Sequence, residues 1–216
     1  MKRVHFLVGL LIFGVLAVLT ETPAQSKIIK SQEYYEGIGK PGVKWYEKSR
    51  RVETSDETFA NGATTRSVIN ISEVLLPDHR RQYTKTTEPG KVSEFEQITI
   101  DYMQYTRKDG GDWTKTDLRQ LGQGTGTGVG ISRRCDQYSV EMSSLNGRSM
   151  QLFNWLSIDG NGDELMFRDV RKWIGEEGLP YREEELTGKL SPRDETGRRI
   201  TTYEYDPNIK IEAPIK

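Results

Sequence analysis

The stretch EFEQITIDYMQYTRKDGGDWTKTDL, residues 94–118, carries the signal that decides the fold. Ile98, Ile100 and Tyr102 alternate with polar residues, which is the period of two expected for a strand with one buried side. The Asp-Gly-Gly-Asp run before Trp113 is a turn sequence, because Asp and Gly tolerate positive φ angles. The stretch therefore predicts an antiparallel hairpin whose rings pack across strands, and it holds no histidine, cysteine or serine for chemistry.

The same alternation recurs along the chain, whereas helical periodicity is scarce. Asn146-Gly147 lies between two such runs and is a strong hairpin signal. A short helix is expected near the start, within residues 27–36. About ten or eleven short strands with short turns predict a mainly β fold: a single large curved antiparallel sheet, a half-open β-barrel, with few short helices. Besides the opening stretch, strands are expected at residues 43–54, 64–76, 80–87, 137–144, 149–158, 165–174, 178–187 and 198–205.

The N-terminus has the three parts of a secretory signal. Lys2 and Arg3 precede a nearly continuous apolar run over residues 6–19, and small residues follow it at Ala24 and Ser26. We expect a signal peptide at residues 1–26 and a single β domain at 27–216, with cleavage after Ala24 or after Ser26. The alternative is an uncleaved N-terminal anchor, although the apolar run is short for a span of about 20 residues. The expected location is the periplasm or the exterior.

The charge balance argues against a nucleic-acid partner. Removal of residues 1–26 takes away Lys2, Arg3 and Glu21, so 29 of the 31 basic and 31 of the 32 acidic residues remain. Nucleic-acid binding needs a concentrated basic surface, which this balance does not offer. Cys135 is the only cysteine, so no internal disulfide is possible and the core must hold the fold.

No combination of residues predicts a catalytic or metal site. His79 is the only histidine after the signal, and with the distant Cys135 it cannot assemble a zinc site without several carboxylates. The run Asp159-Gly-Asn161-Gly-Asp163 resembles the start of a calcium loop, but Glu164 stands where glycine is needed, so a polar turn is the better interpretation. We therefore predict no enzyme activity, no metal and no cofactor.

Two further segments have a distinctive pattern. Residues 122–130, GQGTGTGVG, lack both the dinucleotide pattern and the lysine of a nucleotide-triphosphate loop, and they predict a flexible connection. In the C-terminal tail, Ile209, Ile211, Ala213 and Ile215 fall on one side, so the tail is expected to dock as an edge strand.

Four motifs in order resemble the LolA-like superfamily, which includes the outer-membrane lipoprotein-sorting (LppX-like) proteins. RKWIGEEGLPYREEEL at 171–186 is similar to the family's strand–turn–strand with a Gly-Leu-Pro turn, and TTYEYDPNIKIEAPI at 201–215 is similar to its last strand and tail. In the first half, EVLLPDHRRQY at 73–83 and ITIDYMQYTRKDGGDW at 98–113 resemble its Pro-Asp turn and its Tyr-bearing hairpin. The resemblance spans residues 43–215.

The resemblance implies a periplasmic carrier or sensor that binds a lipid or a lipoprotein acyl chain on the concave face of the half-barrel. A monomer is expected, with envelope proteins as possible further partners. The alternative is an envelope interaction scaffold on the same fold without a small ligand. Apolar positions of the alternating strands are the candidate ligand contacts: Trp45, Ile69, Ile71, Ile98, Ile100, Tyr102, Trp155, Phe167, Trp173 and Tyr203.

Overall fold

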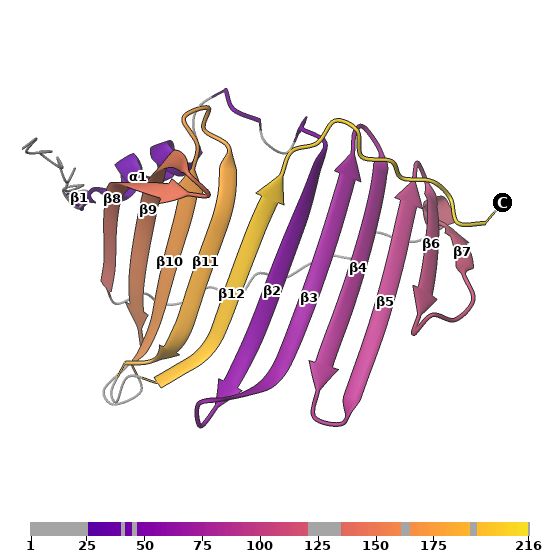
Figure 1. Cartoon of the computed structure of the whole chain (residues 1–216), viewed down its shortest axis with the longest axis horizontal. Helices are drawn as coiled ribbons and strands as arrows, with labels where there is room; N and C mark the ends of the chain where they lie inside the picture. The colour runs from indigo at the N-terminus through magenta and orange to yellow at the C-terminus, as the bar shows by residue number, and fades with distance from the viewer. Residues whose placement is uncertain are drawn as a thin grey trace, which may run out of the picture.

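The protein forms one open antiparallel sheet of twelve strands, in the order β1-β8-β9-β10-β11-β12-β2-β3-β4-β5-β6-β7 (Figure 1). The computed structural model describes residues 26–39, 42–44, 47–120, 135–160, 165–190 and 194–215. The mainly β, single-sheet prediction is confirmed, with twelve strands in place of ten or eleven. The elements are β1 (Lys27–Ile29), α1 (Ser31–Ile38), β2 (Arg50–Ala60), β3 (Ala63–Leu75), β4 (His79–Glu88), β5 (Lys91–Ile100), β6 (Met103–Lys108), β7 (Thr114–Asp117), the 3-10 helix η2 (Leu118–Gln120), β8 (Cys135–Leu145), β9 (Arg148–Asp159), β10 (Met166–Ile174), β11 (Pro180–Lys189) and β12 (Asp194–Glu204).

Two meanders build the sheet, one from β2 to β7 and one from β8 to β12. They join where β12 pairs with β2, and β1 adds to the outer edge of β8 over three residues. The turns follow the chemistry of the sequence. Asn146 and Gly147 between β8 and β9 have φ angles of 52° and 78°, the left-handed conformation that this dipeptide favours.

The opening stretch folds into three strands, where the sequence predicted a single hairpin. Ile100 pairs with Met103, so Asp101 and Tyr102 form a two-residue turn inside the expected strand. Asp101 has a φ of 53°, which Asp tolerates better than most residues. Tyr102 is therefore in the turn, 62% exposed, and does not continue the apolar row of Ile98 and Ile100.

The first long strand also differs from its prediction, since β2 begins at Arg50 and not at Val43. The Glu47 N–H donates to the Lys44 carbonyl at 2.9 Å, and this turn precedes the strand. The Gly-rich residues 122–130, the calcium-like residues 161–164 and the signal segment up to residue 25 lie outside the described residues.

The sheet has two faces, which we name by what covers them. On the helix face, α1 packs against β8 and β9, and the side chain of Thr54 points to this side. On the tail face, Ile209 and Ile211 of the C-terminal segment pack against residues of β5 and β6, and Glu53 points to this side. Strand alternation and the continuous register assign every other position to one face or the other.

A compact aromatic cluster holds α1 on the helix face. Tyr34 of α1 is almost fully buried, and its ring centroid lies 5.0 Å from that of Tyr138 and 6.1 Å from that of Phe153. Trp155 stacks on Tyr138 at 6.5 Å, and Val170 and Ile174 complete the cluster from β10.

A second cluster covers the opposite end of the sheet on its other face. Ile211 of the tail is buried against Ile98 and Tyr105, and the tail runs past the ends of the central strands to reach β6 and β7 (Figure 1). The tail is docked as expected but forms no strand. Pro207 and Pro214 have no N–H to donate, so this segment is a poor ladder partner.

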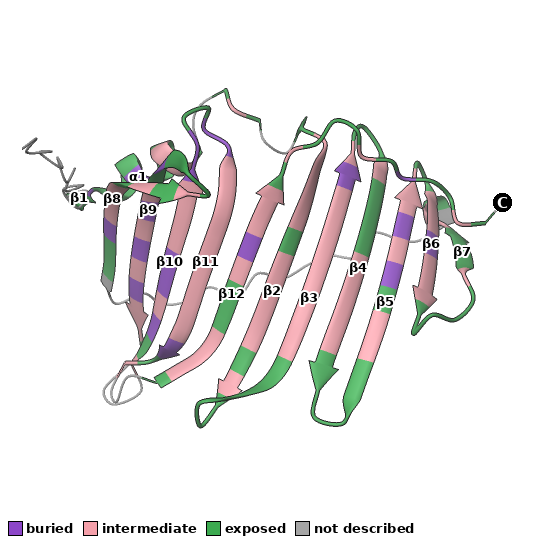
Figure 2. Ribbon diagram, in the orientation of Figure 1, coloured by how far each residue is buried: buried purple, intermediate pink, exposed green. Residues whose placement is uncertain are grey.

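Between the two clusters the central strands carry few buried residues (Figure 2). Within the described ranges, no helix combines the length and the apolar character needed to cross a bilayer. The centre of the sheet thus has little apolar packing, and it contains two hollows.

Candidate functional site

A trough runs along the helix face at the centre of the sheet. It consists of two adjoining hollows of about 570 and 340 Å³ that share Asp56 and Arg199. It follows β2 from Arg50 to Thr58, which at about 3.4 Å per residue is roughly 27 Å. We call the larger hollow, at the Arg50 end, the upper hollow; its other lining residues are Val52, Thr54, Asn70, Ser72, Gln82, Glu183, Thr201 and Tyr203. The smaller, lower hollow is at the Thr58 end; its other lining residues are Glu57, Arg66, Val68, Glu185, Thr187, Gly197 and Arg198.

Short side chains create this trough. Thr54 and Thr201 face each other across β2 and β12, with their hydroxyl oxygens 3.2 Å apart. The Thr84 hydroxyl donates to the Asn70 side-chain oxygen at 2.8 Å, so the floor is polar and internally hydrogen-bonded. Gly197 adds no side chain at all. On the same face, β8, β9 and β10 carry α1 and large aromatic rings, whereas the small residues of the central strands leave a depression.

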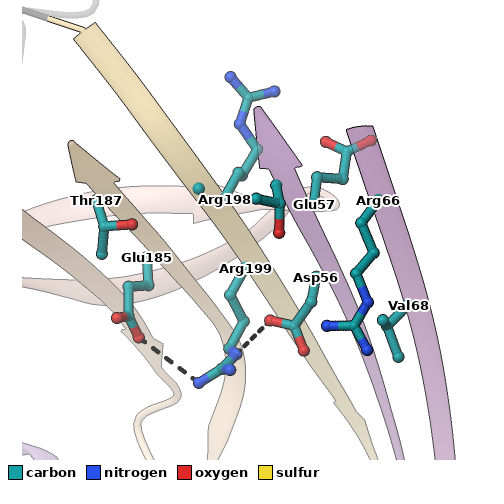
Figure 3. Close-up of a pocket in the computed structure, with 10 residues that line it drawn as sticks. Asp56, Glu57, Arg66, Val68, Glu185, Thr187, Arg198 and Arg199 are labelled. Carbon is teal, nitrogen blue, oxygen red and sulfur yellow. Dashed lines mark hydrogen bonds and ion pairs between the residues drawn. The ribbon is translucent and has the colours of Figure 1, made fainter. Parts of the chain in front are cut away.

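A ladder of alternating charges crosses the trough floor. Arg168 lies 2.7 Å from Glu185, and Arg199 stands between Glu185 and Asp56 (Figure 3). The hydrogen bond to Asp56 raises the pKa of Arg199 above its ordinary value, so this guanidinium stays charged. In this way the ladder joins four neighbouring strands, from β10 to β2.

The upper end of the trough combines arginine and tyrosine side chains. Arg50 donates to the Lys48 carbonyl at 3.1 Å, and Tyr203 lines the hollow beside it. Burial, followed by the nearby Glu183 carboxylate, raises the pKa of Tyr203 to about 12. Tyr203 therefore remains a neutral hydroxyl at physiological pH, able to donate one hydrogen bond and to accept another.

The chemistry available elsewhere is limited. His79 is the first residue of β4, and its Nδ1 is 3.0 Å from a carboxylate oxygen of Asp78 in the preceding turn. In the part of the chain that the structure describes, no three His, Cys, Asp or Glu side chains are grouped as metal ligands. The trough offers hydrogen bonds, paired charges and a shaped surface, which are the means of binding.

The residues expected from the sequence to contact a ligand lie in different places. Tyr203 lines the trough, and Trp155 lies on the same face, inside the aromatic cluster, where its Nε1 donates to Asp136 at 3.0 Å. Tyr102 is in the turn described above, beneath the Arg119 guanidinium. Trp45 lies outside the described residues.

The other six point to the tail face. Ile98 and Ile100 belong to the tail cluster, and Ile71 borders a hollow of about 150 Å³. Ile69 lies one alternate position further along β3, and Phe167 and Trp173 lie on β10. Of the nine candidates that the structure describes, two lie on the helix face, six point to the tail face and Tyr102 is in a turn, so the structure does not bring these nine together in one cavity.

Sequence reasoning missed most of the trough. The apolar positions of the alternating strands do not include Thr54, Asn70, Arg199 or Thr201. A weak signal was present: Thr54 and Thr58 on β2, and Gly197 and Thr201 on β12, are small residues at alternate positions, but the charged Asp56 and Arg199 interrupt both series. The register that brings Thr54 to Thr201 has no local signal, because 147 positions separate the two residues.

No family model matches the sequence, and no curated protein does. Among solved structures, the chain is similar to the LolA superfamily protein NE2245 from Nitrosomonas europaea, with 9% identity and a TM-score of 0.26, over 82% of this chain and 92% of that one. It is also similar to a putative outer membrane lipoprotein-sorting protein domain from Vibrio parahaemolyticus, with 10% identity and a TM-score of 0.27, over 82% and 93% of the two chains.

Proposed function

We propose that this is an exported binding protein that holds a lipid or a lipoprotein acyl chain in the trough of the helix face, and that it acts by binding, without catalysis. The observation that carries the proposal is the trough itself, a depression roughly 27 Å long that runs parallel to the strands. An extended chain fits such a shape better than a compact ligand does.

The lining sets the expected strength of binding. Complete burial of a sixteen-carbon chain would contribute about 12 kcal/mol, at about 0.8 kcal/mol for each methylene. The trough covers the chain from one side only, so about half of that burial free energy is available for binding. Val52 and Val68 and the threonine methyl groups supply apolar contact, whereas Asn70 and Gln82 must stay hydrated or bind a polar part of the ligand. We therefore expect exchangeable binding, as a carrier or a sensor needs.

The test starts from the exported protein purified without detergent. Organic extraction and mass spectrometry should identify a bound lipid, and added fatty acid should displace an apolar fluorescent dye. A Thr54→Trp variant fills the trough and should lose the displacement. Ser55→Trp is the matched control, because Ser55 is the next residue and points to the tail face opposite Ile69.

The two tryptophan variants show which face of the sheet binds the ligand. Loss of binding in Ser55→Trp alone would move the ligand to the tail face, where Ile69 and Ile71 lie, and would overturn the trough proposal. A protein that carries no lipid and takes up none would also overturn it.

A second function is favoured by one observation, the mainly polar lining of the trough. Polar, hydrogen-bonding surfaces are typical of transient protein contacts, so the same face would serve as an interaction scaffold in the cell envelope. Cross-linking from position 54, compared with position 55, tests this reading. An envelope protein captured only from position 54 by a lipid-free chain would support the scaffold.

A further inference from the structure

Two arginines frame one end of the trough. Arg50 on β2 and Arg80 on β4 are both cross-strand neighbours of Val74 on β3, so both point to the helix face with one strand between them. Two strand spacings place their Cα atoms about 10 Å apart, a separation that two long arginine side chains span easily. Val74 is buried between them and gives the pair an apolar base.

Both acidic residues of the upper hollow have basic partners: Asp56 pairs with Arg199, and Glu183 lies 2.9 Å from the Lys172 ammonium. Among the described residues, no carboxylate lies within ion-pair distance of Arg80, which is exposed. Burial, and after it the positive charge of Arg80, lowers the pKa of Arg50, so the two guanidinium groups repel each other electrostatically.

Neutral donors surround the same place. The Ser72 hydroxyl, the Gln82 carboxamide and the Tyr203 hydroxyl all line the upper hollow next to Arg50. An anion here would meet two guanidinium groups and several neutral donors, and it would relieve the repulsion between the arginines. Guanidinium groups bind the oxygen atoms of phosphate with two parallel hydrogen bonds each, which gives both strength and orientation.

We propose that Arg50 and Arg80 bind a phosphate group at the upper end of the trough, so that a chain-bearing ligand lies with its phosphate between them and its chain along β2. This inference rests on the proposed function for the chain, and on the arginine pair for the phosphate. The phosphate belongs either to a lipid headgroup or to a free phosphate compound, and the experiment separates the two sources.

The experiment measures calorimetric binding of four soluble probes: dioctanoyl phosphatidate, dioctanoylglycerol, glycerol 3-phosphate and inorganic phosphate. The two lipids share their acyl chains and differ in the phosphate. We expect phosphatidate to bind at least about ten-fold more tightly than dioctanoylglycerol, the effect of one good charge-assisted contact. In Arg80→Gln this ratio should fall to about three-fold or less.

Lys85→Gln is the matched control. Lys85 lies on the same strand as Arg80 and also carries one positive charge, but it points to the tail face opposite Ile69 and pairs with Glu94. It should keep the full phosphatidate preference. Arg80 is the better position to change than Arg50, because Arg50 is partly buried and its loss would disturb the fold. Circular dichroism checks that all variants are folded.

Each other outcome is decisive. Equal binding of the two lipids, with no binding of the phosphate compounds, overturns the phosphate site and leaves the acyl-chain function intact. Binding of free phosphate that depends on Arg80, without any lipid binding, supports the phosphate site and overturns the acyl-chain function. No binding of any probe overturns both. An equal loss of phosphatidate preference in Lys85→Gln and Arg80→Gln would show that only the overall charge matters, and it would overturn the site.

Discussion

The Glu96 carboxylate accepts two hydrogen bonds from the Arg107 guanidinium across β5 and β6, at 2.6 and 2.8 Å. Its other oxygen accepts two more from Arg81 of β4, at 2.7 and 3.0 Å. Only 8% of the Glu96 side chain is exposed, so four charge-assisted bonds concentrate on one buried group. Glu73 on β3 extends this ladder on the tail face, because it pairs with Arg81 and with Arg51 of β2. The central strands that it joins have little apolar core.

The first prediction concerns the stability of that ladder. Glu96→Gln should lower the free energy of unfolding by about 2–3 kcal/mol, because two guanidinium groups lose their shared anion; the partly exposed arginines keep the loss below that of a fully buried pair. Urea titration measures it. Glu53→Gln is the control, since its pair with Arg51 is exposed and should contribute less than about 0.5 kcal/mol. Equal effects of the two changes would contradict a special role for Glu96.

The second prediction is the pH dependence of the same group. Burial would raise the pKa of Glu96, but the hydrogen bonds from Arg107 and Arg81 outweigh burial and hold the pKa below its ordinary value of 4.5. A lowered folded-state pKa adds stability above the unfolded-state value, and this is lost as the pH falls through the folded-state pKa. The stability gap between the wild type and Glu96→Gln should therefore be constant at neutral pH and shrink below about pH 4.5. Urea midpoints from pH 3 to pH 7 test this, and a gap that widens on acidification would contradict it.

The hairpins of this fold could be predicted because their causes are local. Asn146-Gly147 imposes a turn in any context, and the alternation on both sides imposes the strands. The pairings of β12 with β2 and of β1 with β8 could not be predicted, since they join segments distant in sequence and depend on how the two meanders meet. The turn at Asp101 was hidden because alternation continues across it.

The candidate site was harder to predict than the fold. Period two separates the two sides of one strand, but it does not say which side of β3 shares a face with which side of β9. Ile69 and Trp155 therefore looked alike in sequence and lie on opposite faces. Once the strand register is known, the same alternation assigns each residue to one face of the sheet. The pairing of Thr54 with Thr201 then locates the trough.

The third prediction concerns the docked tail. Ile211 is 6% exposed and packs on Ile98 and Tyr105, whereas Ile215 is 38% exposed. Ile211→Ala should destabilise the protein by about 1–3 kcal/mol, less than the most costly core truncations because the tail can detach. Ile215→Ala should cost less than about 0.5 kcal/mol. Hydrogen exchange should show faster opening of β5 and β6 in Ile211→Ala only, and unchanged exchange there would show that the tail does not protect this end.

The last prediction is that a Gly→Ala change in the helix destabilises this protein, although such a change usually stabilises. Gly→Ala inside a helix usually stabilises by about 0.5–1 kcal/mol, because glycine loses more conformational freedom on folding. At Gly37 of α1, an added Cβ would lie 2.3 Å from two ring atoms of Phe153, which is buried in the aromatic cluster and cannot move away freely. Gly37→Ala should therefore destabilise by about 1–3 kcal/mol, as overpacked cores do.

A double-mutant cycle isolates the cause of that reversal. Phe153→Leu removes part of the ring that the new methyl group would meet, so Gly37→Ala should cost less in the Phe153→Leu background than in the wild type. Gln32→Ala serves as the helix control, because Gln32 is exposed and its change should stay within about 0.5 kcal/mol. A stabilising Gly37→Ala would mean that α1 does not rest on Phe153.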